Sequence, residues 1–266
     1  MEEDSPTPSP RYFVIVCLLV ASLLTQVYSS DVNDIITSRI ETNDANETNI
    51  IGLNSIEEWP VIRVDFPGKI FPNSLLEGLF EGENSAEDYI AQISGGRSSL
   101  NVTIMDEIWT SPYPDSHWGA DSSEKRDVGS ESGGAQELAS EAINSILVGK
   151  DLSLWDLNGD LVIDRLLILH SGQPQEQGGP SSSIWSHYSP LQDPIELGKF
   201  TIEHYTIASI HGGLGVIMHE ILHQMGAVDL YDVHSESPTK NWHGLGDWDI
   251  MASGNWIADG DMPSLP

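Results

Sequence analysis

Residues 219–229 read His-Glu-Ile-Leu-His-Gln-Met-Gly-Ala-Val-Asp. On an α-helix, side chains four residues apart lie on one face, about 6 Å apart along the axis. The imidazoles of His219 and His223 could therefore bind one Zn²⁺ ion. Glu220 follows the first histidine and is placed to act as general base, taking the proton of a zinc-activated water during attack on a carbonyl. The bare five-residue pattern also occurs in ordinary amphipathic helices with two surface histidines, so the flanking sequence decides between the two interpretations.

The residues after the second histidine favour the metal site. Gly226 comes three residues after His223, where it can end the helix in a left-handed turn. Asp229 comes three residues later, and the turn would bring its carboxylate back to the metal as the third ligand. Asp232 is the alternative for that position. The extended pattern H-E-x-x-H-x-x-G-x-x-D has the layout of the metzincin metalloproteases, with Asp in place of the usual third His.

A methionine follows downstream in a stretch that predicts a tight turn. Met251 lies in the segment Trp248–Gly254, and metzincins place such a methionine beneath the zinc site. General core packing is the other interpretation of Met251, and the two are compatible because the metzincin methionine also acts by packing. Some metzincins carry a tyrosine two residues after the methionine. Here that position is Ser253, so no tyrosine is expected at the metal.

The chain resembles the immune-inhibitor-A-like secreted metalloproteases from about Val61 to its C-terminus. The resemblance lies in the blocks at residues 215–220, 229–232 and 244–254, together with Trp-Asp-Leu-Asn-Gly-Asp at 155–160 and Ile-Trp-Ser-His at 184–187. It implies an endopeptidase with His219, His223 and Asp229 as zinc ligands and Glu220 as catalytic base. Members of this family usually continue well beyond the methionine turn. We therefore expect that a catalytic domain ending at Pro266 is incomplete at its C-terminus.

A second candidate metal site precedes the zinc motif. Asp156, Asn158, Asp160 and Asp164 place oxygen side chains at the alternating positions of a short loop, which suits Ca²⁺. The loop is not an EF-hand, because Leu161 occupies the position of the invariant glycine. A simple turn at Asn158 that leads into the next strand is the alternative, and the family resemblance favours calcium.

The remaining pattern predicts an α/β or α+β domain with a mixed, twisted sheet and a metzincin-like arrangement around the active-site helix. Alternating or continuous apolar runs predict strands at residues 61–66, 100–109 and 164–170, and an edge or half-buried strand at 200–207. Apolar residues at helical spacing predict helices from Ser85 to Gly95, from Gln136 to Leu147 and from Gly213 to Gly226.

Composition restricts the partners. The 266 residues carry 41 acidic against 11 basic side chains, for a net charge of −30. Such a chain repels nucleic-acid phosphates and anionic membrane surfaces, so we expect protein or peptide substrates and no nucleic acid. Six other histidines have no ligand-like spacing and are expected to be packing or surface residues: His170, His187, His204, His211, His234 and His243.

The N-terminal region predicts export. Arg11 precedes an apolar run that is short for a membrane span, and Val27-Tyr28-Ser29 fits a signal-peptidase site. We expect a signal peptide at residues 1–29, a polar linker or short pro-segment at 30–58, and a catalytic domain at 59–266. The protein would then be secreted, without stable membrane association. If residues 1–29 are not cleaved, they would anchor it at the cell surface. Cys17 is the only cysteine, so the mature protein would have no disulfide to stabilise it.

Two function classes follow from these patterns. The first is a secreted zinc-dependent endopeptidase. The second is a calcium-stabilised surface or adhesion module that retains the protease fold without its activity. The intact Glu220 favours the first, because a non-catalytic module does not need that carboxylate.

Overall fold

The computed structural model describes residues 14, 15, 18, 20, 50–131, 133–233, 244–260, 263 and 264. The chain divides into two compact units, Met1–Ala45 and Asn46–Pro266. The four described residues of the first unit are helical and exposed. Within the part of the chain that the structure describes, no helix is both long enough and apolar enough to span a membrane. Most of the predicted signal peptide, and His234 and His243, lie outside the described residues.

The second unit is built on a five-stranded mixed sheet. Its strands lie in the order β2-β1-β3-β5-β4. Strands β1, β2, β3 and β5 run parallel to one another, and β4 pairs antiparallel with β5 at one edge of the sheet. The strands are β1 (Ile56–Asp65), β2 (Ser99–Thr110), β3 (Leu167–His170), β4 (His187–Leu197) and β5 (Phe200–Ser209).

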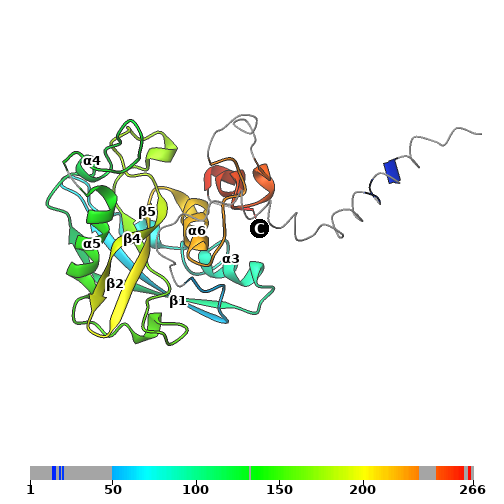
Figure 1. Ribbon diagram of the computed structural model, residues 1–266, viewed down its shortest axis with the longest axis horizontal. Helices are drawn as coiled ribbons and strands as arrows, with labels where there is room; N and C mark the ends of the chain where they lie inside the picture. Colours follow the sequence, from blue (N-terminus) through cyan, green and yellow to red (C-terminus); the bar gives the residue numbers. More distant parts are fainter. Residues whose placement is uncertain are drawn as a thin grey trace, which may run out of the picture. The chain divides into compact units, whose positions relative to one another are not determined.

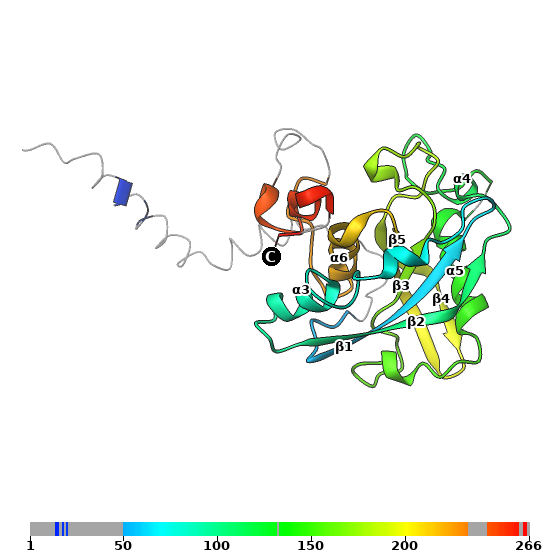
Figure 2. The ribbon, with the colours of Figure 1, turned by 180° about the vertical axis from the view of Figure 1, so that it is seen from behind.

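Helices cover both faces of this sheet. Helix α5 packs on one face, and α3 and α6 lie on the other (Figures 1 and 2). Two hydrophobic clusters result, one on each face, because successive residues of the central strands point to opposite sides. The α-helices are α3 (Ala86–Ile93), α4 (Asp115–Trp118), α5 (Gly134–Leu147) and α6 (Gly213–His223); the 3₁₀-helices are η1 (Asn73–Leu76), η2 (Ser153–Trp155), η3 (Gln175–Gln177), η4 (Gly246–Trp248) and η5 (Ser253–Gly260).

The predicted α/β fold with a mixed sheet is confirmed, with three corrections to its strands. The segment predicted as an edge or half-buried strand is β5, which lies between β3 and β4. Strand β4, which forms the edge beside β5, was not predicted, because Pro190, Pro194 and exposed polar residues conceal its alternation. Strand β1 begins at Ile56, three residues inside the predicted linker and five before the predicted strand start.

A buried ion pair connects the start of β1 to Arg165, which lies before β3. Arg165 in turn contacts the C-terminal end of α6. The guanidinium of Arg165 donates to Glu57 Oε2 at 2.8 Å, and both side chains are fully buried. Arg165 also donates to the carbonyl of Gln224, just after the last residue of α6. The Gln224 side chain in turn bonds the backbone of Leu166, donating to its carbonyl and accepting from its N–H. These contacts fix the end of the helix that carries His223.

Candidate metal centre

Helix α6 brings the two histidines of the motif together. Its apolar residues Ile217, Met218, Ile221 and Leu222 are buried in the cluster on its face of the sheet, which fixes the rotation of the helix. The opposite side of the helix therefore presents both imidazoles, whose ring centroids are 5.0 Å apart. The predicted helix is confirmed, although it ends at His223 and a turn replaces its last three residues.

The turn after α6 brings Asp229 to the same place. Gly226 has φ +88°, a left-handed conformation that glycine adopts without strain. Beyond it, Asp229 Oδ1 lies 3.2 Å from His219 Nε2 and 3.5 Å from His223 Nε2. Ligand atoms of these three residues all lie within 4.8 Å of one another. Among the described residues they form the one such group, and Asp232 does not belong to it.

Hydrogen bonds to main-chain carbonyls orient both imidazoles. His219 Nδ1 lies 2.8 Å from the carbonyl oxygen of Ile250, and His223 Nδ1 lies 2.8 Å from that of Ala227. A carbonyl can only accept, so each Nδ1 carries the proton, and in a neutral ring Nε2 then has a free lone pair. Both Nε2 atoms face Asp229 Oδ1, which is buried and accepts no hydrogen bond from the described residues. Two such lone pairs and a carboxylate oxygen directed at one another are a suitable donor set for a cation, so these residues fit a zinc ion.

The pKa values of the cluster reflect the same convergence of charge. Burial lowers the pKa of His219 and His223, but the carboxylates of Asp229 and Glu220 outweigh it and raise both pKa values. Burial raises the pKa of Asp229, but the two histidines outweigh it and hold that pKa well below its usual range. Burial raises the pKa of Glu220 to about 7, against the opposing effect of the same histidines. Asp229 is therefore the ionised carboxylate of the group.

Glu220 is held by a strand that the sequence did not predict. The backbone N–H of Tyr188, in edge strand β4, donates to Glu220 Oε2 at 2.9 Å. Glu220 Oε1 lies 3.9 Å from His219 Nε2, on the side of the metal group. One oxygen of the carboxylate is thus fixed by the sheet while the other faces the candidate metal position. A main-chain donor carries no side-chain signal, so no residue type could have shown the role of Tyr188.

The predicted methionine turn lies against this group. Met251 is buried in the same cluster as the apolar face of α6. Its backbone N–H donates to Asp249 Oδ1, and its carbonyl accepts from Leu230, the residue after Asp229. The preceding residue, Ile250, supplies the carbonyl that orients His219. The turn therefore supports two of the three candidate ligands through its backbone.

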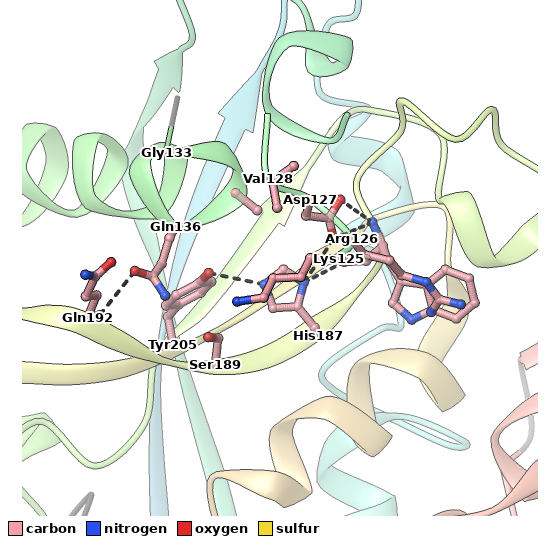
Figure 3. A pocket seen from close by; sticks show the side chains of 12 residues that line it. Lys125, Arg126, Asp127, Val128, Gly133, Gln136, His187, Ser189, Gln192 and Tyr205 are labelled. Carbon is pink, nitrogen blue, oxygen red and sulfur yellow. Dashed lines mark hydrogen bonds and ion pairs between the residues drawn. The ribbon is translucent and has the colours of Figure 1, made fainter. Parts of the chain in front are cut away.

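A second cluster of histidine and aspartate lies around strand β4. His187 lies between Asp127 and Tyr205 (Figure 3). Its Nδ1 is 2.7 Å from the carbonyl of Trp185 and 3.5 Å from Asp127 Oδ2, and its Nε2 is 3.1 Å from the Tyr205 hydroxyl. Both ring nitrogens thus have partners. Together with buried His170 and His204, His187 is a packing residue, as predicted, and exposed His211 is a surface residue.

The predicted calcium loop has a different arrangement. Asp156 accepts hydrogen bonds from the backbone N–H groups of residues 159–161, and Asp160 Oδ1 accepts one from residue 162. Asn158 donates to Asp160, and Asp164 accepts from the N–H of residue 157. Within the described chain, the carboxylates of this loop do not form a metal-binding group. Calcium binding is therefore not supported by this geometry and stays a prediction.

Comparison with known proteins places the chain in a family. The model of the immune inhibitor A peptidase M6 catalytic domain matches residues 70–264. Immune inhibitor A of Bacillus thuringiensis subsp. alesti is 29% identical over 199 residues, which cover 64% of this chain and 28% of that protein. The pre-pro-metalloprotease PrtV of Vibrio cholerae serotype O1 (strain M66-2) is 31% identical over 152 residues, 46% of this chain and 16% of that protein. The chain thus spans less than a third of the length of either relative. Because the family match covers most of the sequence and includes the whole α6 region, the protein belongs to the immune inhibitor A peptidase M6 family.

Proposed function

We propose that the protein is a secreted zinc-dependent endopeptidase in which His219, His223 and Asp229 hold the metal. The observation that supports this most is the convergence of two imidazole Nε2 atoms and one ionised carboxylate oxygen within 4.8 Å. Three protein ligands with a fourth position left for water or substrate are typical of catalytic zinc sites, whereas structural zinc sites have four. Asp229 is preferred over Asp232, because only Asp229 lies in this group of described residues.

Glu220 is the general base of this proposal. Zn²⁺ bound there supplies Lewis acidity and makes water a nucleophile at neutral pH. The Tyr188 N–H holds Glu220 Oε2, so Oε1 is the atom that takes the proton from the attacking water. Met251 has a structural role, since the backbone of its turn contacts His219 and the residue after Asp229.

The substrates of this enzyme would be proteins or peptides. Both named relatives support a proteolytic role, one as a peptidase-family protein and one as a metalloprotease. Export rests on the leader pattern at residues 1–29. Calcium in the loop at 156–164 remains an additional proposal. The alternative of a non-catalytic adhesion module is not favoured, because such a module has no use for a Glu220 carboxylate held beside two imidazoles.

The experiment that tests the function compares the wild type with Glu220→Gln. Wild-type protein with one equivalent of zinc should cleave casein, and a zinc chelator should stop cleavage. Glu220→Gln should retain zinc but lose activity by several orders of magnitude, because the amide cannot accept the proton.

Glu196→Gln is the matched control, since Glu196 is an exposed residue of β4. It removes the same charge and should cleave casein like the wild type. Near-normal activity of Glu220→Gln with a full complement of zinc would overturn the assigned mechanism.

A further inference from the structure

A cavity of about 320 Å³ opens directly beside the proposed catalytic group. His219 and Glu220 form part of its wall, and Glu176, Trp185, Tyr231 and Trp256 also line it. Its volume lies at the lower end of the range for small-ligand pockets, which suits one long side chain. A substrate peptide bound at the proposed catalytic group would therefore place one side chain, next to its scissile bond, in this cavity.

Besides Glu220, two carboxylates line the cavity. Glu176 and Asp232 both line it, and none of its described lining residues is Lys or Arg. Glu176 Oε2 accepts a hydrogen bond from the N–H of Ser186 at 3.2 Å. Its Oε1 is buried and has no hydrogen-bond partner among the described residues. A buried carboxylate oxygen without a donor is costly, so this atom favours a ligand that brings a positively charged N–H group.

The aromatic residues of the cavity suit the same kind of ligand. Tyr231 and Trp256 are partly exposed at its wall, at 38% and 39%. The guanidinium of Arg126 lies 3.5 Å from the centroid of the Trp185 ring and already covers it, so Tyr231 and Trp256 are the aromatic side chains that remain for a ligand. Aromatic faces attract ammonium and guanidinium groups and also pack against the methylene groups that lead to them. Apolar walls with carboxylates therefore match the long, positively charged side chains of Lys and Arg.

The charge of the whole chain acts in the same direction. A net charge of −30 attracts cationic peptides over distances up to the screening length. This general field does not place a side chain. The local carboxylate of Glu176 does so, because its Oε1 can accept a hydrogen bond from a cationic group at one defined position of the cavity.

We infer that this cavity is a specificity pocket for a Lys or Arg side chain of the substrate, next to the scissile bond, and that Glu176 is its specificity-determining residue. The inference rests on the proposed peptidase function and names the substrate class of that same site.

The test uses zinc-loaded protein and fluorescence-quenched peptides that differ at one position. Lys, Arg, norleucine and Glu are placed in turn at each of the two positions on either side of the cleaved bond, and kcat/KM is measured. At one position, Lys and Arg should exceed norleucine, and Glu should be poorest. In Glu176→Gln, the ratio of Lys to norleucine at that position should fall by about tenfold, as expected for the loss of one charge-assisted hydrogen bond.

Glu196→Gln again provides the control, since it removes one negative charge far from the cavity and should leave the ratio unchanged. The wild-type series is decisive even if Glu176→Gln folds poorly. Equal cleavage of Lys and norleucine peptides at every position would overturn the pocket assignment while leaving the peptidase proposal intact. An unchanged ratio in folded Glu176→Gln would overturn the role of Glu176. If no peptide is cleaved at all, the proposed function itself fails.

Discussion

Two clusters of histidine and aspartate lie close together in this protein and behave in opposite ways. In the first, His219 and His223 face Asp229, whose pKa is held low while theirs are raised. In the second, burial raises the pKa of Asp127 to about 8 and lowers the pKa of His187. In the first cluster the neighbouring charges favour the charged forms, whereas in the second burial favours the neutral form of both groups.

The difference arises from what each imidazole nitrogen contacts. In the metal cluster, carbonyls take the Nδ1 protons and leave both Nε2 atoms directed at one carboxylate oxygen. In the second cluster, the Trp185 carbonyl and the Tyr205 hydroxyl occupy both nitrogens of His187. Identical residue types can therefore offer ligands to a metal only where the second contact of each ring leaves a lone pair free.

The largest expected effect concerns the third ligand of the metal cluster. Asp229→Ala leaves two histidines, too few for a firm tetrahedral site, so it should lose zinc and peptidase activity together. Asp232→Ala should keep its zinc, because Asp232 is outside the group of converging atoms. The zinc content of both variants after dialysis shows which of the two aspartates is the third ligand. Loss of metal from Asp232→Ala alone would move the ligand assignment from one aspartate to the other.

A variant of the second cluster sharpens the same comparison. His187→Gln should retain the wild-type zinc content, since neither nitrogen of His187 faces the metal group. Reduced zinc in folded His187→Gln would contradict the separation of the two clusters.

A third set of carboxylates, in the loop at 156–164, should give an intermediate effect if it binds calcium. Binding to the native state alone stabilises by about 2.7 kcal/mol at a hundredfold excess over Kd. Calcium should then raise the Tm of the wild type, and Asp160→Ala should lose most of that increase. An equal calcium response in wild type and variant would show that the loop carboxylates serve only the backbone N–H groups they contact.

The last expected effect is a pH dependence of folding that comes from the second cluster. Burial, followed by the charges of Asp121 and Glu176, raises the pKa of Asp127, while the Trp185 N–H and Arg126 oppose the rise. The folded state therefore binds this proton more tightly than the unfolded state. Its stabilisation is complete below the unfolded pKa of about 3.9 and is lost as pH rises through about 8.

Asp127→Asn should remove this contribution. Between the unfolded and the folded pKa of Asp127, the folded state binds one more proton than the unfolded state. The free energy of unfolding then falls by about 1.4 kcal/mol for each rise of one pH unit. Urea denaturation at several pH values from 5 to 8 should therefore give a shallower slope for the variant. Asparagine suits the site because residue 127 has φ +52°, which Asn tolerates. If the free energy of unfolding changes with pH equally in wild type and variant, Asp127 is ionised in the folded protein and the prediction is wrong.

Local sequence predicted several elements closely. Ser85 caps α3 by accepting from the N–H of Asp88, and left-handed Gly95 and Gly96 follow the helix end, as their residue types indicate. Strand β4 escaped prediction because it gains its identity from pairing with β5, and its prolines and polar residues show no clear alternation. The hydrogen bond from the Tyr188 N–H to Glu220 could not be predicted either, because Tyr188 lies in this strand.

By itself, the sequence determined the α/β class, the helix that carries the motif, and the convergence expected of His219, His223 and Asp229. Those features depend on helical spacing and on a glycine turn, both of which are local. Only the tertiary structure decided which carboxylates face imidazoles and which face backbone N–H groups. The loop at 156–164 and the cluster around His187 contain suitable residue types, yet both oxygens of Asp156 and both ring nitrogens of His187 already contact neighbours. Whether a carboxylate or an imidazole is available to a metal depends on contacts between segments far apart in the chain, which spacing alone does not encode.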